Sequence, residues 1–291
     1  KTAMLASAGA GLLRTLPAEA RGIPAAAFPG LPREVCYPGP PTGVIATSVF
    51  DLFKVGPGPS SSHTLAPLRI ASDFRNLLET LPPETLAAAD HIDARLYGSL
   101  SATGKGHRTD RAILAGLLGQ KPETCDPAIM DALADESRTH SATIGGKPFM
   151  IGKHTLAWDK IEHDYPFSNT LVMQLVTAQG TALVSREYYS TGGGFFSWKD
   201  QPEQKRGEPV HPYGSMTAFA ALAEKRGKSL HDIMLENEMA IMGVDTARVN
   251  AHLDLVLDTM LDGVDLGLRE EGVLPAPFAF FRKARRIHEQ A

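Results

Sequence analysis

The chain has 291 residues, of which 43% are hydrophobic and 21% are charged, and its formal net charge at pH 7 is −4. A chain of this length can bury a sizeable core in one large domain or in two ordinary ones. The mild acidity gives no basic surface for nucleic acid, and no run of about 18 apolar residues predicts a membrane span. We therefore expect a globular protein without nucleic-acid or membrane partners.

The first 46 residues are rich in Ala, Gly and Pro and contain only two acidic residues, Glu19 and Glu34. An arginine-bearing, acid-poor start of this kind can be a transit peptide, and AMLASAGAGLL faintly resembles the apolar core of a signal peptide. We favour a disordered extension over residues 1–46. The two cysteines, Cys36 and Cys125, match no disulfide framework and no CxxC metal spacing, so a reducing, cytoplasmic compartment is expected.

From SVFDLFKVG onward, the apolar residues follow patterns that predict a mixture of helices and strands. Helical spacing predicts one helix that ends at LPPE and a second that is capped by Thr109 and ends at Gly119. Alternating apolar residues predict strands, and two β-rich runs around Gly180 predict a hairpin. The predicted helices cover residues 65–80 and 110–119, and the predicted strands cover 91–98, 147–151, 169–178 and 181–190.

After Gly214 the pattern changes to three consecutive helices, predicted at residues 215–227, 229–243 and 245–268. In the third helix one apolar stripe has little in this chain to pack against. That stripe comprises Val249, Leu253, Val256, Leu257, Met260 and Val264. The predicted fold is thus an α/β (α+β) N-terminal domain with a mixed sheet and helices over 47–212, followed by the opening helices of an all-α domain over 213–291.

The stretch SSSHT, residues 60–64, directly precedes the predicted helix 65–80. The first N–H groups of a helix have no internal partner and the helix dipole is positive there, so a carboxylate or phosphate is a natural ligand. His63 would lie beside that anion with a pKa of about 6.5, which suits proton transfer. The alternative is that one serine caps the helix and the other residues form a loop.

The stretch YGSLSATGKGHRTD, residues 97–110, places a glycine-rich loop between a strand and a helix. A nucleotide P-loop is excluded, because five residues separate Gly98 from Gly104 where that motif needs four, and Gly106 follows Lys105 where Ser or Thr is required. The loop can still present Lys105 and His107 at a helix N-terminus, with Gly104 and Gly106 allowing close approach to a small ligand. The alternative is a plain turn with a solvated lysine.

A third stretch, EYYSTGGGFF, residues 187–196, contains three successive glycines after a predicted strand. Each glycine costs backbone entropy on folding, so such a run is typical of a bulge or of a place where a ligand or another domain approaches the backbone. The alternative is a flexible linker between the two domains.

Taken together, these segments resemble one family, the iron–sulfur-dependent L-serine dehydratases, also called L-serine ammonia-lyases. SVFDLFKVGPGPSSSHT is similar to the start of that family's β domain, and LYGSLSATGKGHRTD and YYSTGGGFF are similar to its second and third signatures. LENEMA and EGVLPAPF are similar to the opening of the family's α, or catalytic, region. The segments follow the family's order from Ser48 onward, which makes the resemblance specific.

The resemblance implies conversion of L-serine to pyruvate and ammonia without pyridoxal phosphate, with a [4Fe–4S] cluster in the α region acting as Lewis acid on the hydroxyl. Such an elimination needs a base for the α-proton and a clamp for the carboxylate. His63 and His107 match the family's two motif histidines, and they are expected to be the base and the substrate-orienting group, in either order. The expected carboxylate clamp is Ser60, Ser61, Ser62 and Thr64, with Lys105 and Gly106 as further substrate contacts.

A cluster needs about three or four thiolates, and in the family they come from a part of the α region that this sequence does not reach. Neither Cys36 nor Cys125 can replace them, so we expect half of an active site and no metal ligands here. The expected partners are L-serine and the remaining α region, on the same chain or a separate subunit, in a homodimer. The alternative is a non-catalytic serine-binding or regulatory module, related to a small-molecule-binding domain of some phosphoglycerate dehydrogenases.

Overall fold

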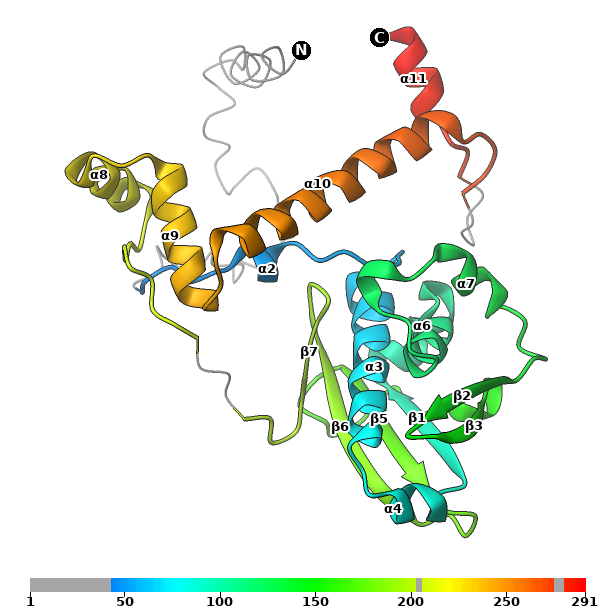
Figure 1. The fold of residues 1–291 in the computed structure, drawn as a ribbon. Coiled ribbons are helices and arrows are strands. Elements are labelled where there is room, and N and C mark those ends of the chain that lie inside the picture. The colour runs from blue at the N-terminus through cyan, green and yellow to red at the C-terminus, as the bar shows by residue number, and fades with distance from the viewer. Residues whose placement is uncertain (1–42, 203–205, 275–279) are drawn as a thin grey trace. The chain divides into compact units, whose positions relative to one another are not determined.

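The computed structural model describes residues 43–202, 206–274 and 280–291 (Figure 1). Most of the extension predicted to be disordered, together with Cys36, lies outside the described residues. The chain divides into two units. The described part of the smaller unit is 43–45 with 212–227, and that of the larger unit is 46–202 and 206–211 with 228–274 and 280–291.

The larger unit contains a five-stranded mixed sheet with the strand order β4-β1-β5-β6-β7. Strand β1 pairs in parallel with β4, and the other neighbours are antiparallel. The strands of this sheet are β1 (His91–Tyr97), β4 (Leu156–Trp158), β5 (Asn169–Val176), β6 (Ala182–Gly192) and β7 (Phe195–Trp198). A separate antiparallel hairpin is formed by β2 (His140–Ile144) and β3 (Lys147–Ile151). The expected mixed sheet is confirmed.

The predicted strand β1 shows a clear alternation of apolar and polar side chains. In β1, Ile92, Ala94 and Leu96 are buried while the residues between them are not, so the period of two marks the face that meets the core. The predicted hairpin around Gly180 is also confirmed, because β5 and β6 pair antiparallel. The short strands β2, β4 and β7 were not predicted.

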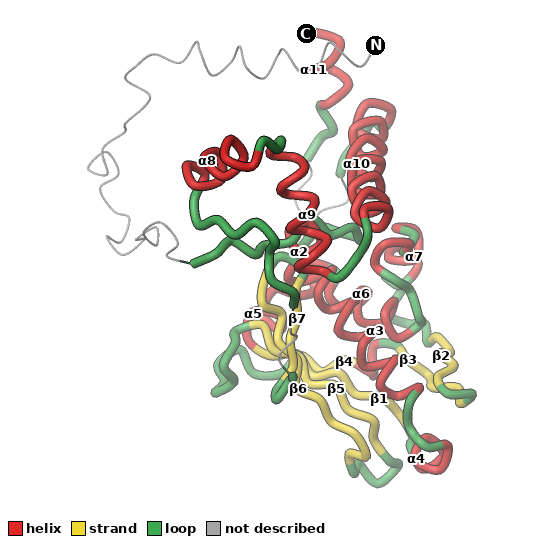
Figure 2. The backbone as a smooth tube through the Cα atoms, turned by 60° about the vertical axis from the view of Figure 1, so that its left-hand side comes forward, coloured by secondary structure: helices red, strands yellow, loops and turns green. Residues whose placement is uncertain are grey.

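In the larger unit, α3 (Ala66–Glu79) and α5 (Gly98–Thr103) contact strands of the sheet (Figure 2). The other helices in this part of the chain are α2 (Val49–Leu52), α4 (Pro83–Ala88), α6 (Thr109–Leu117) and α7 (Pro127–Ala132). Helices α3 and α6 pack against each other, and α3 also contacts β5, β6 and β7. Side chains with no exposed surface fill the space between these layers, including Leu68 and Phe74 of α3, Leu96 of β1, and Ile113 and Leu117 of α6.

Both predicted helix starts lie within one residue of the observed ones. The helix expected from residue 65 begins at Ala66 and follows directly on a π-helical turn, η3 (Ser61–Leu65). Thr109 does not cap the next helix; it is the first residue of α6, and the N-cap is Arg108, with a left-handed φ of 60°. The Thr109 hydroxyl is unable to act as a cap because it donates a hydrogen bond of 2.5 Å to the carbonyl of His63.

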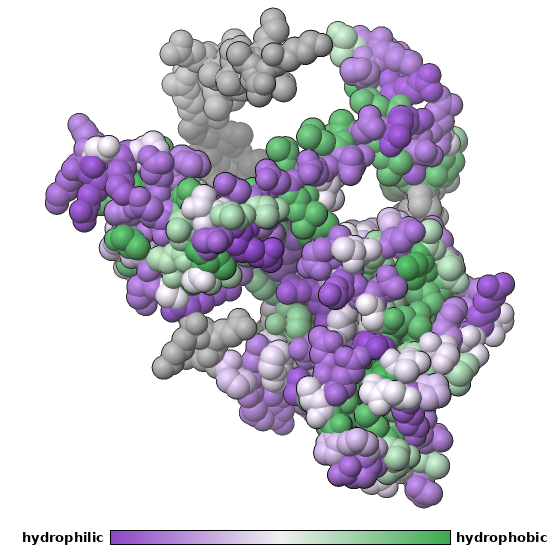
Figure 3. Space-filling view, in the orientation of Figure 1, coloured by the Kyte–Doolittle hydropathy of each residue, from purple (hydrophilic) through white to green (hydrophobic). Residues whose placement is uncertain are grey.

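Three further helices of the larger unit are α9 (Leu230–Met242), α10 (Thr246–Arg269) and α11 (Ala284–Gln290). Ser229 caps α9 by accepting from the backbone N–H of Asp232. Hydrophobic side chains gather along α10 (Figure 3), where Leu257, Met260 and Val264 are 54%, 62% and 61% exposed. The apolar stripe predicted for this helix is therefore uncovered over most of its length.

In the described residues of the smaller unit, 43–45 and 212–227, the helix is α8 (Met216–Arg226). Ser215 caps this helix by accepting from Ala218, and the ring of Tyr213 stacks on that of Phe219 with 4.3 Å between centroids. Ile45 donates a backbone hydrogen bond of 2.9 Å to Tyr213. Among the described residues of both units, no helix combines the length and hydrophobicity that a membrane crossing requires.

Candidate active site

The structure brings the two histidines of the first two motifs together. His63 lies in η3, and His107 ends a short 3-10 turn, η4 (Gly104–His107), that follows α5. Their ring centroids are 5.0 Å apart, with 49° between the ring planes. The two rings are thus neighbours, which a shared substrate would require, and their roles stay a prediction.

Two buried hydroxyls connect the segments that carry the imidazoles. Thr64 donates a hydrogen bond of 2.6 Å to the carbonyl of His107, and Thr109 donates one of 2.5 Å to the carbonyl of His63. Both threonine side chains belong to residues with no exposed surface. Each motif thus holds the backbone of the other motif's histidine, and the two rings keep their spacing through this reciprocal pair of bonds.

Both ring nitrogens of His63 are hydrogen-bonded to serine hydroxyls. Nδ1 lies 2.9 Å from Ser62 Oγ, and Nε2 lies 3.1 Å from Ser99 Oγ. The residue is 8% exposed, and burial lowers the pKa of its imidazole below the ordinary value, with a smaller contribution from the neighbouring His107. His63 is therefore a neutral, oriented imidazole near pH 7. Sequence reasoning did not single out Ser99, although it lies within the second motif.

His107 differs from His63 because one of its ring nitrogens is left open. Its Nδ1 lies 2.9 Å from the carbonyl oxygen of Thr103. A carbonyl can only accept, so Nδ1 must carry the proton and the neutral ring has its lone pair on Nε2. Among the described residues Nε2 has no hydrogen-bond partner. The ring lines an open recess of about 900 Å³ with Pro59, Ser101 and Trp158.

The four residues of the expected carboxylate clamp occupy different environments. Ser60 accepts a hydrogen bond of 3.1 Å from the backbone N–H of His63, which makes it the cap of η3. Ser61 is exposed, and Ser62 is half-buried with its hydroxyl on His63. Thr64 has no exposed surface and its hydroxyl is already engaged. The clamp therefore stays a prediction, and Ser61 and Ser62 are its members whose hydroxyls do not bond to the backbone.

Lys105 and Gly106 lie at the edge of the same recess. The Lys105 ammonium is 3.5 Å from Glu136 and 5.7 Å from the centre of the Trp158 ring. A Cβ added at Gly106 would meet no atom within 4 Å, whereas one at Gly104 would come within 2.7 Å of the Trp158 ring. Packing therefore requires a glycine at position 104, because the Trp158 ring of the same chain leaves no room for a Cβ there.

The three glycines of the third motif form a turn between β6 and β7, so the flexible-linker interpretation was wrong. Their φ angles are 96°, 57° and 78°, all in the left-handed region that favours glycine. A Cβ at Gly194 would come within 2.8 Å of Leu65 and 3.2 Å of Lys54. The run of glycines predicted a close approach to the backbone, and Lys54 of the first motif and Leu65, directly after it, make that approach.

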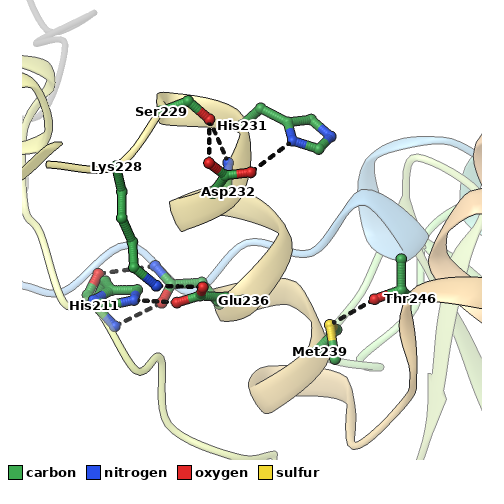
Figure 4. Close-up of polar contacts among 9 residues, drawn as sticks. His211, Lys228, Ser229, His231, Asp232, Glu236, Met239 and Thr246 are labelled. Atoms are coloured by element: carbon green, nitrogen blue, oxygen red, sulfur yellow. Dashed lines mark hydrogen bonds and ion pairs between the residues drawn. The ribbon is translucent and has the colours of Figure 1, made fainter. Parts of the chain in front are cut away.

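The LENEMA segment uses its polar residues to hold α9 against other parts of the larger unit (Figure 4). Glu236 accepts from His211 at 2.5 Å and from Lys228. Asn237 exchanges two hydrogen bonds with the backbone of His211, at 2.7 and 2.8 Å. The buried carboxylate of Glu238 accepts from Ser48 Oγ at 2.5 Å and from the first N–H of α2 at 3.1 Å. These contacts give the segment a structural role.

The residues present do not fit an iron–sulfur cluster. In the described part of the chain, no three His, Cys, Asp or Glu side chains gather into a possible metal site. The whole sequence has two cysteines, of which Cys125 is buried, with a pKa raised by that burial. A cluster needs about three or four thiolates, so this chain alone does not provide its ligands.

Residues 48–201 match the family model described as serine dehydratase beta chain. Similar proteins include L-serine dehydratase 2 of Escherichia coli (strain K12), 32% identical over 256 residues, and an L-serine dehydratase of Streptomyces coelicolor, 34% identical over 253 residues. An L-serine dehydratase of Haemophilus influenzae is 32% identical over 252 residues. These matches cover 82–83% of this chain but only 53–54% of each relative, so the chain spans about half the length of the curated relatives it matches.

Proposed function

Because the chain belongs to the serine dehydratase beta chain family, we propose that it forms the substrate-binding half of an enzyme that converts L-serine to pyruvate and ammonia. The observation that supports this most directly is the pair of adjacent imidazoles, one enclosed between two serines and the other with an open nitrogen. A pair of that kind suits the removal of a proton from a bound amino acid.

His107 is the base in this proposal. Its Nδ1–H is held by the Thr103 carbonyl at 2.9 Å, so Nε2 presents a lone pair to the recess. Abstraction of serine's α-proton by Nε2, with loss of hydroxide from the β-carbon, gives 2-aminoacrylate. That enamine takes up a proton to become an imine, and water then hydrolyses the imine to pyruvate and ammonia. The proton that His107 gains is returned to solvent or to the departing hydroxide.

His63 orients the substrate and is not the base. Both of its ring nitrogens already have hydroxyl partners, Ser62 and Ser99, so neither nitrogen is open to the α-proton of serine. Burial disfavours its charged form, which keeps the ring neutral beside His107 as that residue becomes positive. A neutral neighbour avoids the repulsion that a second imidazolium would create.

The serine carboxylate is expected at the start of η3. Ser61 and Ser62 supply hydroxyls there, as the first two residues of η3, while the N–H of His63 is already bonded to Ser60. Thr64, which the sequence placed in the clamp, instead acts as a positioning residue through the backbone of His107. Lys105 adds positive charge to the lining of the recess, and its ammonium also forms an ion pair with Glu136.

The departure of hydroxide requires a group that this chain does not supply. The relatives extend over about twice the matched length, and we propose that the corresponding polypeptide brings a [4Fe–4S] cluster, which would provide Lewis acidity. The uncovered apolar stripe of α10 offers a surface for such a polypeptide, because exposed apolar patches of that size mark interaction sites. We expect the assembly to work in a reducing compartment such as the cytoplasm.

The proposal is tested by pyruvate formation after this chain is combined, without oxygen, with the polypeptide that corresponds to the other half of its relatives, plus iron and sulfide. His107→Gln should lower the rate at least about a hundredfold. His231→Gln, at a histidine whose side chain is 78% exposed, is the matched control and should be unchanged. Rates equal to those of the unaltered protein in His107→Gln would contradict the assignment. Serine binding without turnover in the complete assembly would favour the regulatory module.

A further inference from the structure

A second cavity, of about 410 Å³, shares no lining residue with the histidine recess. It is bounded by α2 and the residues after it, by η3 with the start of α3, and by the first turns of α10. All of these elements belong to the larger unit. The mechanism proposed above uses none of the residues that line this cavity.

Positive charge dominates the lining of this cavity. Three cations, Lys54, Arg69 and Arg248, line it together with one carboxylate, that of Glu123. Among the described residues, none of the three cations lies within ion-pair distance of a carboxylate oxygen. Glu123 attracts Arg69 and Asp51 attracts Lys54 over longer distances, which offsets part of this charge. Three cations still face one lining carboxylate, and an anion placed between them would relieve the remaining repulsion.

The two inner cations are held in place by uncharged groups. The Lys54 ammonium donates to the carbonyl of Asp51 and lies 3.3 Å from the centre of the Phe195 ring. Arg69 Nη1 donates a hydrogen bond of 2.7 Å to the carbonyl of Gly194. Burial and then the charge of Arg69 lower the pKa of Lys54. Both side chains are thus oriented before any ligand arrives, and ordering them adds no cost to binding.

A polar side chain and apolar rings complete the lining. His252 stacks on Phe50 with 4.4 Å between ring centroids, and its Nε2 is buried without a hydrogen-bond partner among the described residues. A buried polar atom without a partner costs free energy that a ligand oxygen could recover. Phe53 and Leu65 add apolar surface to the same cavity.

Two of the motifs found in the sequence meet at this cavity. Lys54 and Leu65 come from the first motif region, and the turn carrying Gly194 comes from the third. The left-handed backbone of Gly194 lets Leu65 and Lys54 pack against it while its carbonyl holds Arg69. The run of glycines therefore helps to shape this second cavity.

We propose that this cavity binds a small anion that carries a carboxylate or phosphate group on a compact apolar body. The oxyanion lies between Lys54, Arg69 and Arg248, and the apolar part lies against Phe50 and Leu65. The cavity volume admits a molecule of a few carbon atoms. The inference does not depend on the reaction proposed for the histidine site.

Isothermal titration calorimetry of the purified chain tests this site with sodium butanoate and, separately, sodium phosphate, at an ionic strength held constant with sodium chloride. We expect saturable binding of at least one anion. Lys54→Gln and Arg248→Gln should each weaken it at least about tenfold, since each removes one charged contact. Lys199→Gln, at an exposed lysine outside the cavity, is the matched control and should bind like the unaltered chain.

The two anions identify the head group, because binding of butanoate alone indicates a carboxylate and binding of phosphate alone indicates a phosphate ester. Arg248 is exposed, so its substitution leaves the fold intact even if Lys54→Gln unfolds the chain, which circular dichroism would detect. Absence of saturable binding by both anions overturns the proposal. So does equal affinity in Arg248→Gln and Lys199→Gln.

Discussion

The reciprocal threonine bonds between the two histidine segments lead to the most specific prediction. Replacing Thr64 or Thr109 by Val keeps the shape of the side chain and removes only the hydroxyl. The carbonyl of His107 or His63 would then lose a hydrogen bond of 2.6 or 2.5 Å inside a region without exposed surface. The Thr64 hydroxyl also accepts a hydrogen bond of 3.2 Å from the backbone N–H of Ser60, so Thr64→Val acts on the backbone of both histidine segments, whereas Thr109→Val acts on that of His63.

The size of the effect follows from burial. A buried carbonyl left without a partner costs about 1–3 kcal/mol, and a unit of this size loses about 2–4 °C in melting temperature for each kcal/mol. We therefore expect each valine variant to lower the free energy of unfolding by about 1–3 kcal/mol. Thr259→Val, at an exposed threonine of α10, removes a similar hydroxyl-to-carbonyl bond and should change stability by less than about 0.5 kcal/mol.

Urea unfolding followed by circular dichroism measures stability on the isolated chain, and pyruvate formation in the assembled enzyme measures the effect on the site. Thr64→Val should lower kcat more than it raises KM, and Thr64→Ser, which restores the hydroxyl, should recover most of the loss. The reasoning is refuted if Thr64→Val matches Thr259→Val in stability. It is equally refuted if Thr64→Ser and Thr64→Val have the same kcat.

Three further predictions concern single residues. Gly104→Ala should destabilise the chain and lower activity because its Cβ would collide with Trp158, whereas Gly106→Ala should be tolerated; equal melting temperatures would contradict this. Burial lowers the pKa of His63 below 6.5, so the unfolded chain binds a proton that the folded chain does not, and stability should fall as pH decreases below about 6.5. Between pH 7.5 and pH 5, the urea concentration at the midpoint of unfolding should fall less in His63→Gln than in the unaltered chain. Ser48→Ala removes a hydrogen bond to the buried Glu238 carboxylate and should cost about 1.5–3 kcal/mol in unfolding free energy; an unchanged value would show that this contact is dispensable.

The sheet could be predicted where the sequence carries a local signal. The alternation in β1 and the two β-rich runs of β5 and β6 each mark a buried face within a few residues, so pattern alone located them. Strand β4 has only three residues, too few to show a period, and it pairs with β1, which is distant in the sequence. The start of α6 was misplaced for a similar reason, since the partner of Thr109 is His63, far away in sequence.

The candidate site was predicted in part, through the order of the motifs. That order associated His63 with His107 before any distance was known, but it left open which of them acts as the base. The distinction comes from the partners of the ring nitrogens, which are serine hydroxyls for His63 and the Thr103 carbonyl for His107. Ser99 was missed because a hydroxyl one residue into a helix has no local feature that indicates which side chain it will meet.

The protonation state of His107 tests the central claim most directly. Two-dimensional nitrogen-15 NMR of the uniformly labelled chain, with His107 assigned by comparison with His107→Gln, distinguishes protonated from unprotonated ring nitrogens near pH 7.5. We predict a proton on Nδ1 and a lone pair on Nε2, consistent with the bond to Thr103. A His107 ring with its proton on Nε2 would contradict the assignment of this residue as the base.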